Sequence, residues 1–269
     1  MKVCMIFTEG PHDVAFVRKV LKIFLNAEEK TKIKISDFPK PLDSIFEGYV
    51  KNREMQDLSL DMVQKFFLPD RIFERENYFI MLFYTGGKDN IEHVKSFISE
   101  FNFTLKYKPD VKLGFEGVNY LFINDADEDN YVDVIKNMKE MYFPIVDDDT
   151  GDKYLTEEDV NFYVWHGENG KGTLENILIG LLKSSNERLF SESETYVKSN
   201  FENLKSPENV SVQAKQYKAI LTCAGQGKSS GASLNSILVR DNFDLIKVDV
   251  FKNSEFVKSF ADFLISVLN

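Results

Sequence analysis

The segment Val3-Cys4-Met5-Ile6-Phe7-Thr8-Glu9-Gly10-Pro11-His12-Asp13 decides the fold that we predict for this chain. It opens with five consecutive apolar residues, a pattern typical of a strand that is covered on both faces in a parallel sheet. A turn follows, in which Pro11 suits the first position of a helix because its missing N–H costs little there. Apolar residues then recur at helical spacing, at Val14, Val17, Leu21 and Phe24. The segment therefore predicts a strand, a tight turn and a helix.

The same alternation is repeated further along the chain. A continuous apolar run predicts a second strand at 78–84, and largely apolar segments predict strands at 118–123 and 160–165; helical periodicity follows at 91–101 and 132–141. Alternating strands and helices imply a parallel sheet with right-handed crossovers. We therefore expect an α/β fold with a parallel sheet of about four strands flanked by helices.

The spacing of these elements predicts the domain organisation. Residues 1–170 are expected to form the core, with an insertion at about 28–76 that is too long for a simple loop. Short helices are expected inside this insertion, at 43–49 and 60–67. Residues 171–269 are expected to form a helical region packed on the core, with helices at 174–182, 192–204 and 256–268.

The charge balance limits the function classes. The 269-residue chain has 43 acidic and 33 basic residues and a formal net charge of -10. Such a chain is a poor fit to a protein held on nucleic acid by bulk charge alone. It does fit an enzyme that meets phosphate through bound metal ions. Two groups of lysines, if they border the site, are candidates to follow a phosphate backbone: Lys106, Lys108 and Lys112, and Lys215, Lys218 and Lys228.

The cysteines and the apolar runs predict the compartment. Cys4 and Cys223 form no Cys-x-x-Cys pair, and two isolated thiols favour a reducing cytoplasm over a disulfide-built secreted domain. The N-terminal apolar run is too short for a signal peptide. No apolar run approaches the roughly 20 residues that span a bilayer. We expect a cytoplasmic protein without a membrane segment.

Acidic residues follow two of the predicted strands. Glu9 comes directly after the first strand, and Asp125 and Asp127 end the third. Ligands of parallel α/β sheets collect at the carboxyl ends of the strands. Carboxylates gathered there repel one another unless a cation is present, and a hard divalent ion with oxygen ligands, most simply Mg²⁺, removes that repulsion. Taken singly, Glu-Gly and Asp-x-Asp are common surface turns; their joint occurrence at strand ends favours a metal site.

The same residues carry a resemblance to a known family. The segment from Phe7 to Phe16, with Glu9-Gly10-Pro11-His12-Asp13 at its centre, resembles the first motif of Toprim domains. Phe122-Ile123-Asn124-Asp125-Ala126-Asp127 resembles their second motif, a hydrophobic strand that ends in Asp-x-Asp. Looser similarity to small stand-alone Toprim proteins and to the Toprim module of overcoming-lysogenization-defect (OLD) nucleases extends to 86–90, 172–176 and Lys218.

The resemblance implies roles for six residues. Glu9 matches a metal ligand or general acid/base, and Asp125 and Asp127 match the pair that holds Mg²⁺ or Mn²⁺. Asp13 matches the second acid of the nuclease-type first motif. Glu175 matches a later acid that completes a two-metal site, and Lys218 matches a residue that steadies charge on the phosphorane.

The resemblance also implies a reaction. The chain offers no assignable topoisomerase tyrosine and no primase zinc module, which favours a Mg²⁺-dependent nuclease acting on DNA or RNA. OLD-type nucleases pair this module with an ATPase, so an ATPase partner encoded elsewhere and a phage-defence setting are expected. The alternative is a non-catalytic Toprim regulator that binds metal and phosphate, on nucleic acid or nucleotide. One or two metal ions, and monomer or homodimer, stay open.

Two weaker patterns are interpreted as structural. The acidic run 147–152 fails the EF-hand spacing and indicates a surface turn, and Gly227-Lys228-Ser229 lacks the first glycine of a phosphate loop. His12 is expected to be a helix-entry residue rather than a ligand.

Overall fold

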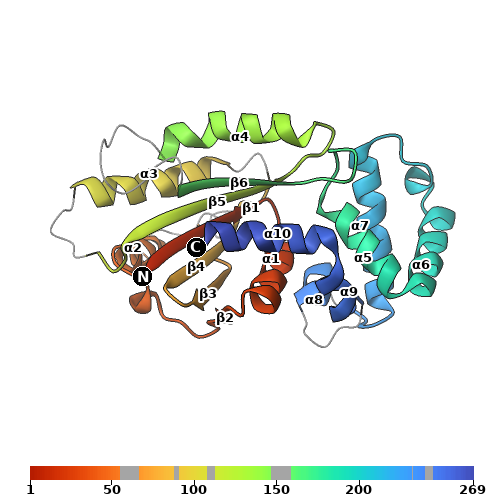
Figure 1. Ribbon diagram of the computed structural model, residues 1–269, viewed down its shortest axis with the longest axis horizontal. Helices are drawn as coiled ribbons and strands as arrows, with labels where there is room; N and C mark the ends of the chain where they lie inside the picture. Colours follow the sequence, from red (N-terminus) through yellow and green to blue (C-terminus); the bar gives the residue numbers. More distant parts are fainter. Residues whose placement is uncertain (55–66, 88–90, 108–112, 147–158, 232, 240–244) are drawn as a thin grey trace.

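A computed structural model describes residues 1–54, 67–87, 91–107, 113–146, 159–231, 233–239 and 245–269. Its centre is a six-stranded sheet in the order β2-β3-β4-β1-β5-β6 (Figure 1). The strands are β1 (Lys2–Thr8), β2 (Glu28–Glu29), β3 (Arg71–Arg75), β4 (Tyr78–Tyr84), β5 (Gly117–Asp125) and β6 (Val160–Trp165).

The four parallel strands β4, β1, β5 and β6 are those expected from the sequence. β1 pairs in parallel with β4 and β5, and β5 pairs in parallel with β6. Alternate residues of the apolar run face opposite sides of the sheet: Cys4 and Ile6 join one core cluster, and Met5 and Phe7 join the other. Both faces are covered, which explains why the strand is apolar at consecutive positions.

The expected number of about four strands is too low. β2 and β3 both belong to the predicted insertion, and they extend the sheet in antiparallel fashion beyond β4. β2 has only two residues, and Arg71, Glu74 and Arg75 leave β3 with little apolar character. Edge strands of this kind are short and charged, which protects the sheet against pairing with other chains. They are also hard to recognise in a sequence for the same reason.

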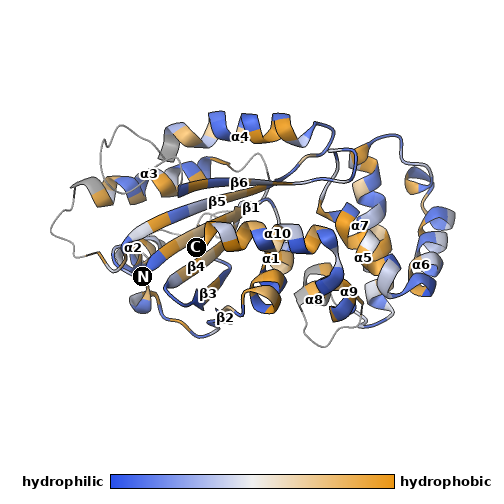
Figure 2. Ribbon diagram, viewed as in Figure 1, coloured by the Kyte–Doolittle hydropathy of each residue, from blue (hydrophilic) through white to orange (hydrophobic). Residues whose placement is uncertain are grey.

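Helices cover both faces of the sheet. One face packs against α2 (Leu42–Glu54), α3 (Ile91–Tyr107) and α4 (Tyr131–Val146). The other packs against α1 (Pro11–Phe24) and α10 (Glu255–Val267), and the same core cluster continues into α5 (Leu174–Ser185), α7 (Val210–Gln226), α8 (Leu234–Val239) and α9 (Val248–Asn253). Figure 2 shows that the helices carry apolar and polar stripes, as expected for a layer between core and solvent. The expected helix at 43–49 is part of α2; the one at 60–67 lies almost wholly outside the described residues.

The carboxyl ends of the parallel strands point toward a helical lobe. This lobe is built from α5, α6 (Glu187–Asn200) and α7, which pack on one another, and it lies at the right of Figure 1. α5 begins nine residues after β6 ends, so the lobe is tied to the edge at which the acidic motifs end. Within the described residues, no helix is both long enough and apolar enough to cross a membrane.

Candidate active site at the carboxyl edge of the sheet

Four of the predicted acids lie at one edge of the sheet. Glu9 follows β1, Asp125 is the last residue of β5, and Asp13 and Glu175 lie in the first turns of α1 and α5. We call these four side chains the acidic cluster. Glu9 and Asp13 belong to one short segment, whereas Asp125 and Glu175 are far from it in the sequence; Glu9 and Asp125 meet because β1 and β5 are neighbours.

Two hydrogen bonds fix the cluster across element boundaries. The backbone N–H of Asp125 donates to Glu9 Oε1 at 3.2 Å, which joins β5 to the end of β1. The backbone N–H of Leu174 donates to Asp125 Oδ1 at 2.8 Å, which joins α5 to β5. Both bonds place a carboxylate against a strand end or a helix start, where N–H groups need acceptors. The predicted convergence of Glu9 and Asp125 is therefore present in the structure.

Asp13 is held by the turn that precedes it. Its Oδ2 accepts a hydrogen bond from the backbone N–H of Gly10 at 3.0 Å, at the N-terminus of α1. The side chain is almost fully buried. A carboxylate at the first turn of a helix is favoured by the helix dipole, but burial acts against its charged form.

The electrostatics of the cluster are unfavourable to full ionisation. Burial, followed by the charges of Glu175 and Glu9, raises the pKa of Asp13 to about 7. Burial and the charges of Asp13, Glu9 and Glu175 also raise the pKa of Asp125 well above its ordinary value. In the absence of a cation, the cluster therefore holds protons that ordinary aspartates release near pH 4.

Glu175 has a different environment because two side chains stabilise its charge. His12 Nδ1 lies 3.2 Å and Lys218 Nζ 3.4 Å from Glu175 Oε1. Burial acts to raise the pKa of Glu175, but the His12 hydrogen bond and the charge of Lys218 outweigh it and hold the pKa below its usual value. The other oxygen, Oε2, is buried without a partner of hydrogen-bond geometry among the described residues. The Thr173 hydroxyl lies close enough to help lower this pKa, although the contact lacks that geometry.

Asp127 occupies a strained corner beside the cluster. Its φ is +52°, in the left-handed region, and it exchanges two backbone hydrogen bonds with Gly172, at 2.8 and 2.9 Å. Gly172 has φ +114°, and a Cβ there would lie 2.6 Å from Asn176 Oδ1. Asp127 is not among the charges that raise the pKa of Asp13 or Asp125. Asp125 thus contributes its side chain to the acidic cluster, and the backbone of Asp127 anchors the adjoining loop.

The donor chemistry of the cluster fits a hard divalent cation. All four side chains offer carboxylate oxygens, two of them have raised pKa values from mutual repulsion and burial, and Glu175 Oε2 is buried without a partner. Among the described residues, however, no three His, Cys, Asp or Glu side chains converge closely enough to hold a metal ion. The oxygens of the acidic cluster instead accept hydrogen bonds from backbone N–H groups or lie against His12 and Lys218. A metal ion at this edge would therefore require these carboxylate side chains to rotate.

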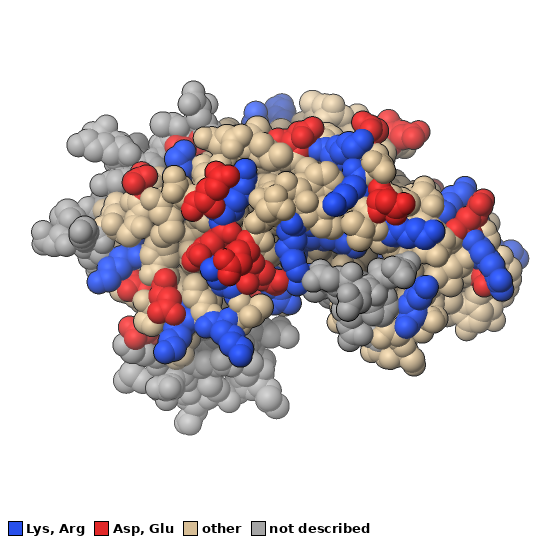
Figure 3. Space-filling model, turned by 60° about the horizontal axis from the view of Figure 1, so that its bottom comes forward, with Lys and Arg blue, Asp and Glu red and all other residues tan. Residues whose placement is uncertain are grey.

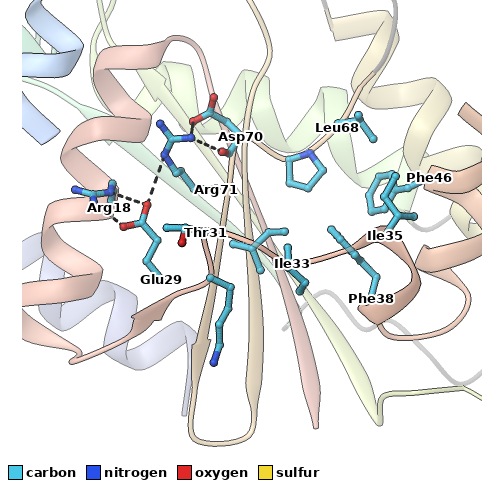
Figure 4. A pocket seen from close by; sticks show the side chains of 13 residues that line it. Arg18, Glu29, Thr31, Ile33, Ile35, Phe38, Phe46, Leu68, Asp70 and Arg71 are labelled. Carbon is cyan, nitrogen blue, oxygen red and sulfur yellow. Dashed lines mark hydrogen bonds and ion pairs between the residues drawn. The ribbon is translucent and has the colours of Figure 1, made fainter. Parts of the chain in front are cut away.

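A second charged region lies at the side edge of the sheet that the antiparallel strands β2 and β3 form. A pocket of about 470 Å³ is bordered by α1, β2, β3 and the segment that follows β2 (Figure 4). Arg18 makes a bidentate pair with Glu29, at 2.8 and 2.6 Å, and Arg71 lies between Glu29 and Asp70. We call this region the edge pocket. Its acids are matched by arginines, unlike those of the acidic cluster.

The surface gives limited support to binding by bulk charge. On the face shown in Figure 3, basic and acidic side chains are interspersed, and the described part of that face has no continuous basic track. Lys218 borders the acidic cluster through Glu175. Of the other predicted lysine group, Lys108 and Lys112 lie outside the described residues.

Comparisons with known proteins support the fold alone. No protein-family model matches the chain, and no curated protein matches it significantly. The structure is similar to the crystal structure of the hypothetical protein PH0156 from Pyrococcus horikoshii OT3, with a TM-score of 0.53 and 16% identity. The match covers 99% of this chain and 98% of that chain. The arrangement of strands and helices is therefore shared along the whole length.

One contributor to the site was missed in the sequence. His12 lies in the first turn of α1, as expected, but its imidazole also contacts Glu175. The two residues are separated by 163 positions in the chain, so no local pattern links them. The available signal was indirect: His12 lies between Glu9 and Asp13 in the motif itself.

Proposed function

We propose that this protein is a divalent-metal-dependent phosphodiesterase that cleaves DNA or RNA through a Toprim-like centre at the acidic cluster. The observation that carries the proposal is the meeting of Glu9 with Asp125, through the hydrogen bond from the Asp125 backbone to Glu9 Oε1. These residues belong to the two motifs that resemble the Toprim family. The raised pKa values of Asp13 and Asp125 support it further, since perturbed acids cluster at functional sites.

The chain's own residues have separable tasks in this proposal. Glu9, Asp13, Asp125 and Asp127 hold Mg²⁺ or Mn²⁺, and Glu175 completes the ligand set if a second ion binds. The ion supplies Lewis-acid stabilisation of the phosphoryl oxygens and a lowered pKa for water. Lys218 is half-exposed beside Glu175 and offers a positive charge to a phosphodiester at the edge. His12 keeps Glu175 ionised and fixes the direction of its carboxylate.

An ATPase partner belongs to the same proposal. OLD-type nucleases combine the module with an ATPase, and the described chain supplies no part that resembles one. We propose that such a partner acts with this chain in the cytoplasm, in phage defence. Co-purification of a tagged chain from its own host, followed by an ATP-hydrolysis assay of the captured complex, tests this point.

Cleavage by the purified protein tests the proposal directly. Plasmid DNA, single-stranded DNA and a structured RNA are incubated with the protein in Mg²⁺, in Mn²⁺ and in excess chelator. We expect cleavage of at least one substrate, with complete dependence on the metal. The double variant Glu9→Gln/Asp125→Asn should cut at least about 100-fold more slowly. If the double variant cuts as fast as the parent, or no substrate is cut in either metal, the nuclease proposal is wrong.

One observation favours a second candidate function. Because no three donors converge among the described residues, the site also suits a regulator that binds metal and phosphate without turnover. Calorimetry distinguishes the two functions. Binding of Mn²⁺ and an oligonucleotide without any product over many hours favours the regulator, whereas product formation excludes it.

A further inference from the structure

A small cavity adjoins the acidic cluster on the other side of Glu9. It has a volume of about 220 Å³ and lies between the carboxyl ends of β1, β4 and β5 and helix α4. Glu9 and Asn124 come from the strand ends, and Asn137, Met138 and Tyr142 come from α4. Asp13 and Glu175 lie on the opposite side, on the helices that cover the other face of the sheet. Glu9 is therefore shared by the cavity and the cluster.

The walls of the cavity suit a flat, uncharged ring. Met138 and Tyr142 are buried, and Met141 lies at the rim with 44% of its surface exposed. Thioether and aromatic side chains make favourable contacts with planar π systems. Phe122 stacks on Tyr142 with ring centroids 3.8 Å apart, so the tyrosine is held firmly in the wall.

The polar groups of the cavity suit the edge of such a ring. Asn124 and Asn137 carry neutral amides, the side chains that pair with base edges in nucleic-acid recognition. The Tyr142 hydroxyl adds a hydrogen-bond donor to the same wall. None of the described lining residues is a lysine or arginine. Two of the described lining residues, Glu9 and Asp129, carry carboxyl groups, which disfavour a phosphate group inside the cavity.

The volume and the framework favour a single ring system. The cavity is smaller than the roughly 300–1,000 Å³ of sites for drug-sized ligands. Its floor is fixed by backbone hydrogen bonds from Thr85 to Thr8 and from Gly87 to Glu9, at 2.8 and 2.9 Å. A Cβ at Gly87, whose φ is +106°, would meet no atom within 4 Å. The space is thus present before any ligand arrives.

We propose that this cavity binds one nucleobase of a single-stranded substrate, next to the phosphodiester that reaches the acidic cluster. This inference rests on the proposed function and names the substrate class: unpaired nucleic acid with one base turned out of the stack. Enzymes and binding proteins read such bases by stacking and by amide hydrogen bonds. Glu9, which borders both spaces, sets the position of the base relative to the scissile phosphate.

Binding measured in the absence of metal tests the inference independently of catalysis. AMP, CMP and ribose 5-phosphate are titrated into the full chain in chelator and followed by saturation-transfer NMR. We expect the base protons to receive the strongest saturation and both mononucleotides to bind about tenfold or more tightly than ribose 5-phosphate. Equal binding of all three ligands, or none at all, overturns the inference.

Two exposed positions of α4 provide the matched variants. Asn137→Trp places an indole at the cavity, whereas Val132→Trp places one on the same helix away from it. We expect Asn137→Trp to weaken mononucleotide binding about tenfold or more and Val132→Trp to leave it unchanged. Met141→Trp serves as a second blocking variant if Asn137→Trp fails to fold. Equal binding by the blocking and control variants overturns the inference.

The same samples separate this inference from the proposed function. Mn²⁺ affinity is measured for the parent and for Asn137→Trp, and we expect the two values to agree because the metal-binding carboxylates are unchanged. A parent that binds bases but neither Mn²⁺ nor Mg²⁺ contradicts the nuclease and supports the cavity. A parent that cuts nucleic acid in Mn²⁺ but shows no preference for a base supports the nuclease and contradicts the cavity.

Discussion

The acidic cluster and the edge pocket both hold partly buried carboxylates, but among the described residues only the edge pocket pairs them with arginines. In the edge pocket, Glu29 meets Arg18 in a bidentate pair, and Arg71 links Glu29 to Asp70. In the acidic cluster, the Lys218 ammonium and the His12 ring contact Glu175, while Asp13 and Asp125 have raised pKa values. A matched set of charges stabilises the fold as it stands. We propose that the excess negative charge of the acidic cluster is balanced by a bound divalent cation.

The strongest test of this contrast is the bidentate pair itself. Glu29 and Arg18 expose only 11% of their side chains each. Glu29→Gln leaves a mostly buried guanidinium without its counter-charge, and we expect a loss of about 3 kcal/mol in the free energy of unfolding. Urea denaturation at pH 7.5 measures it. A loss below about 1 kcal/mol would show that this pair does not stabilise the edge.

The equivalent change in the acidic cluster should have the opposite sign. Asp125→Asn keeps an oxygen to accept the Leu174 N–H and removes a charge that its neighbours disfavour. We expect the metal-free protein at pH 8 to gain about 1–2 kcal/mol of stability, and Mn²⁺ affinity to fall at least about tenfold. Thermal unfolding with and without Mn²⁺ measures both effects. A destabilised variant would contradict the contrast.

Asp13 makes the stability of the metal-free protein depend on pH. Its pKa is raised from 3.8 to about 7, so between these values the folded state holds a proton that the unfolded state has released. The stability that this group contributes is therefore full below about pH 4 and falls as pH rises toward 7, by on the order of 4 kcal/mol. Asp13→Asn should flatten this fall in urea titrations at pH 5, 6, 7 and 8.

Metal provides the control for that pH dependence. The proposed function has a cation bind the ionised cluster in the folded state only, so saturating Mn²⁺ should restore at pH 8 the stability lost on deprotonation. Parallel pH profiles for the parent and Asp13→Asn would show that Asp13 does not carry the effect.

The smallest change in stability is expected at the exposed ion pair between Arg71 and Asp70 in the edge pocket. Arg71 and Asp70 are 42% and 35% exposed, so their ion pair lies mostly in solvent. Asp70→Asn should change stability by less than about 0.5 kcal/mol, in contrast to Glu29→Gln in the same pocket. A change as large as that of Glu29→Gln would mean that the network, rather than burial of a single pair, sets the energy.

The sequence predicted the parts of the fold that depend on local patterns. The four parallel strands are largely apolar because helices cover the sheet, and this pattern can be recognised without knowing which strands are neighbours. β2 and β3 lack the signal because one has two residues and the other is rich in Arg and Glu. Their place in the sheet depends on pairing with β4, which is a tertiary property.

The same distinction between local patterns and tertiary packing applies to the residues of the acidic cluster. The convergence of Glu9 and Asp125 could be expected because parallel strands end at one edge, and the structure places them in contact. The role of Glu175 was implied by resemblance, whereas its contacts with His12 and Lys218 depend on where α5, α1 and α7 pack. The backbone corner at Asp127 depends on its two hydrogen bonds with Gly172, which no spacing rule contains.

The placement of Trp165 gives the molecule a built-in optical reporter. It is the single tryptophan of the chain, it is fully buried, and it pairs in register with Asp125 across β5 and β6. The emission of an indole shifts with the electric field around it. Intrinsic fluorescence should therefore follow the filling of this edge by an ion in real time, with no dye attached to the protein.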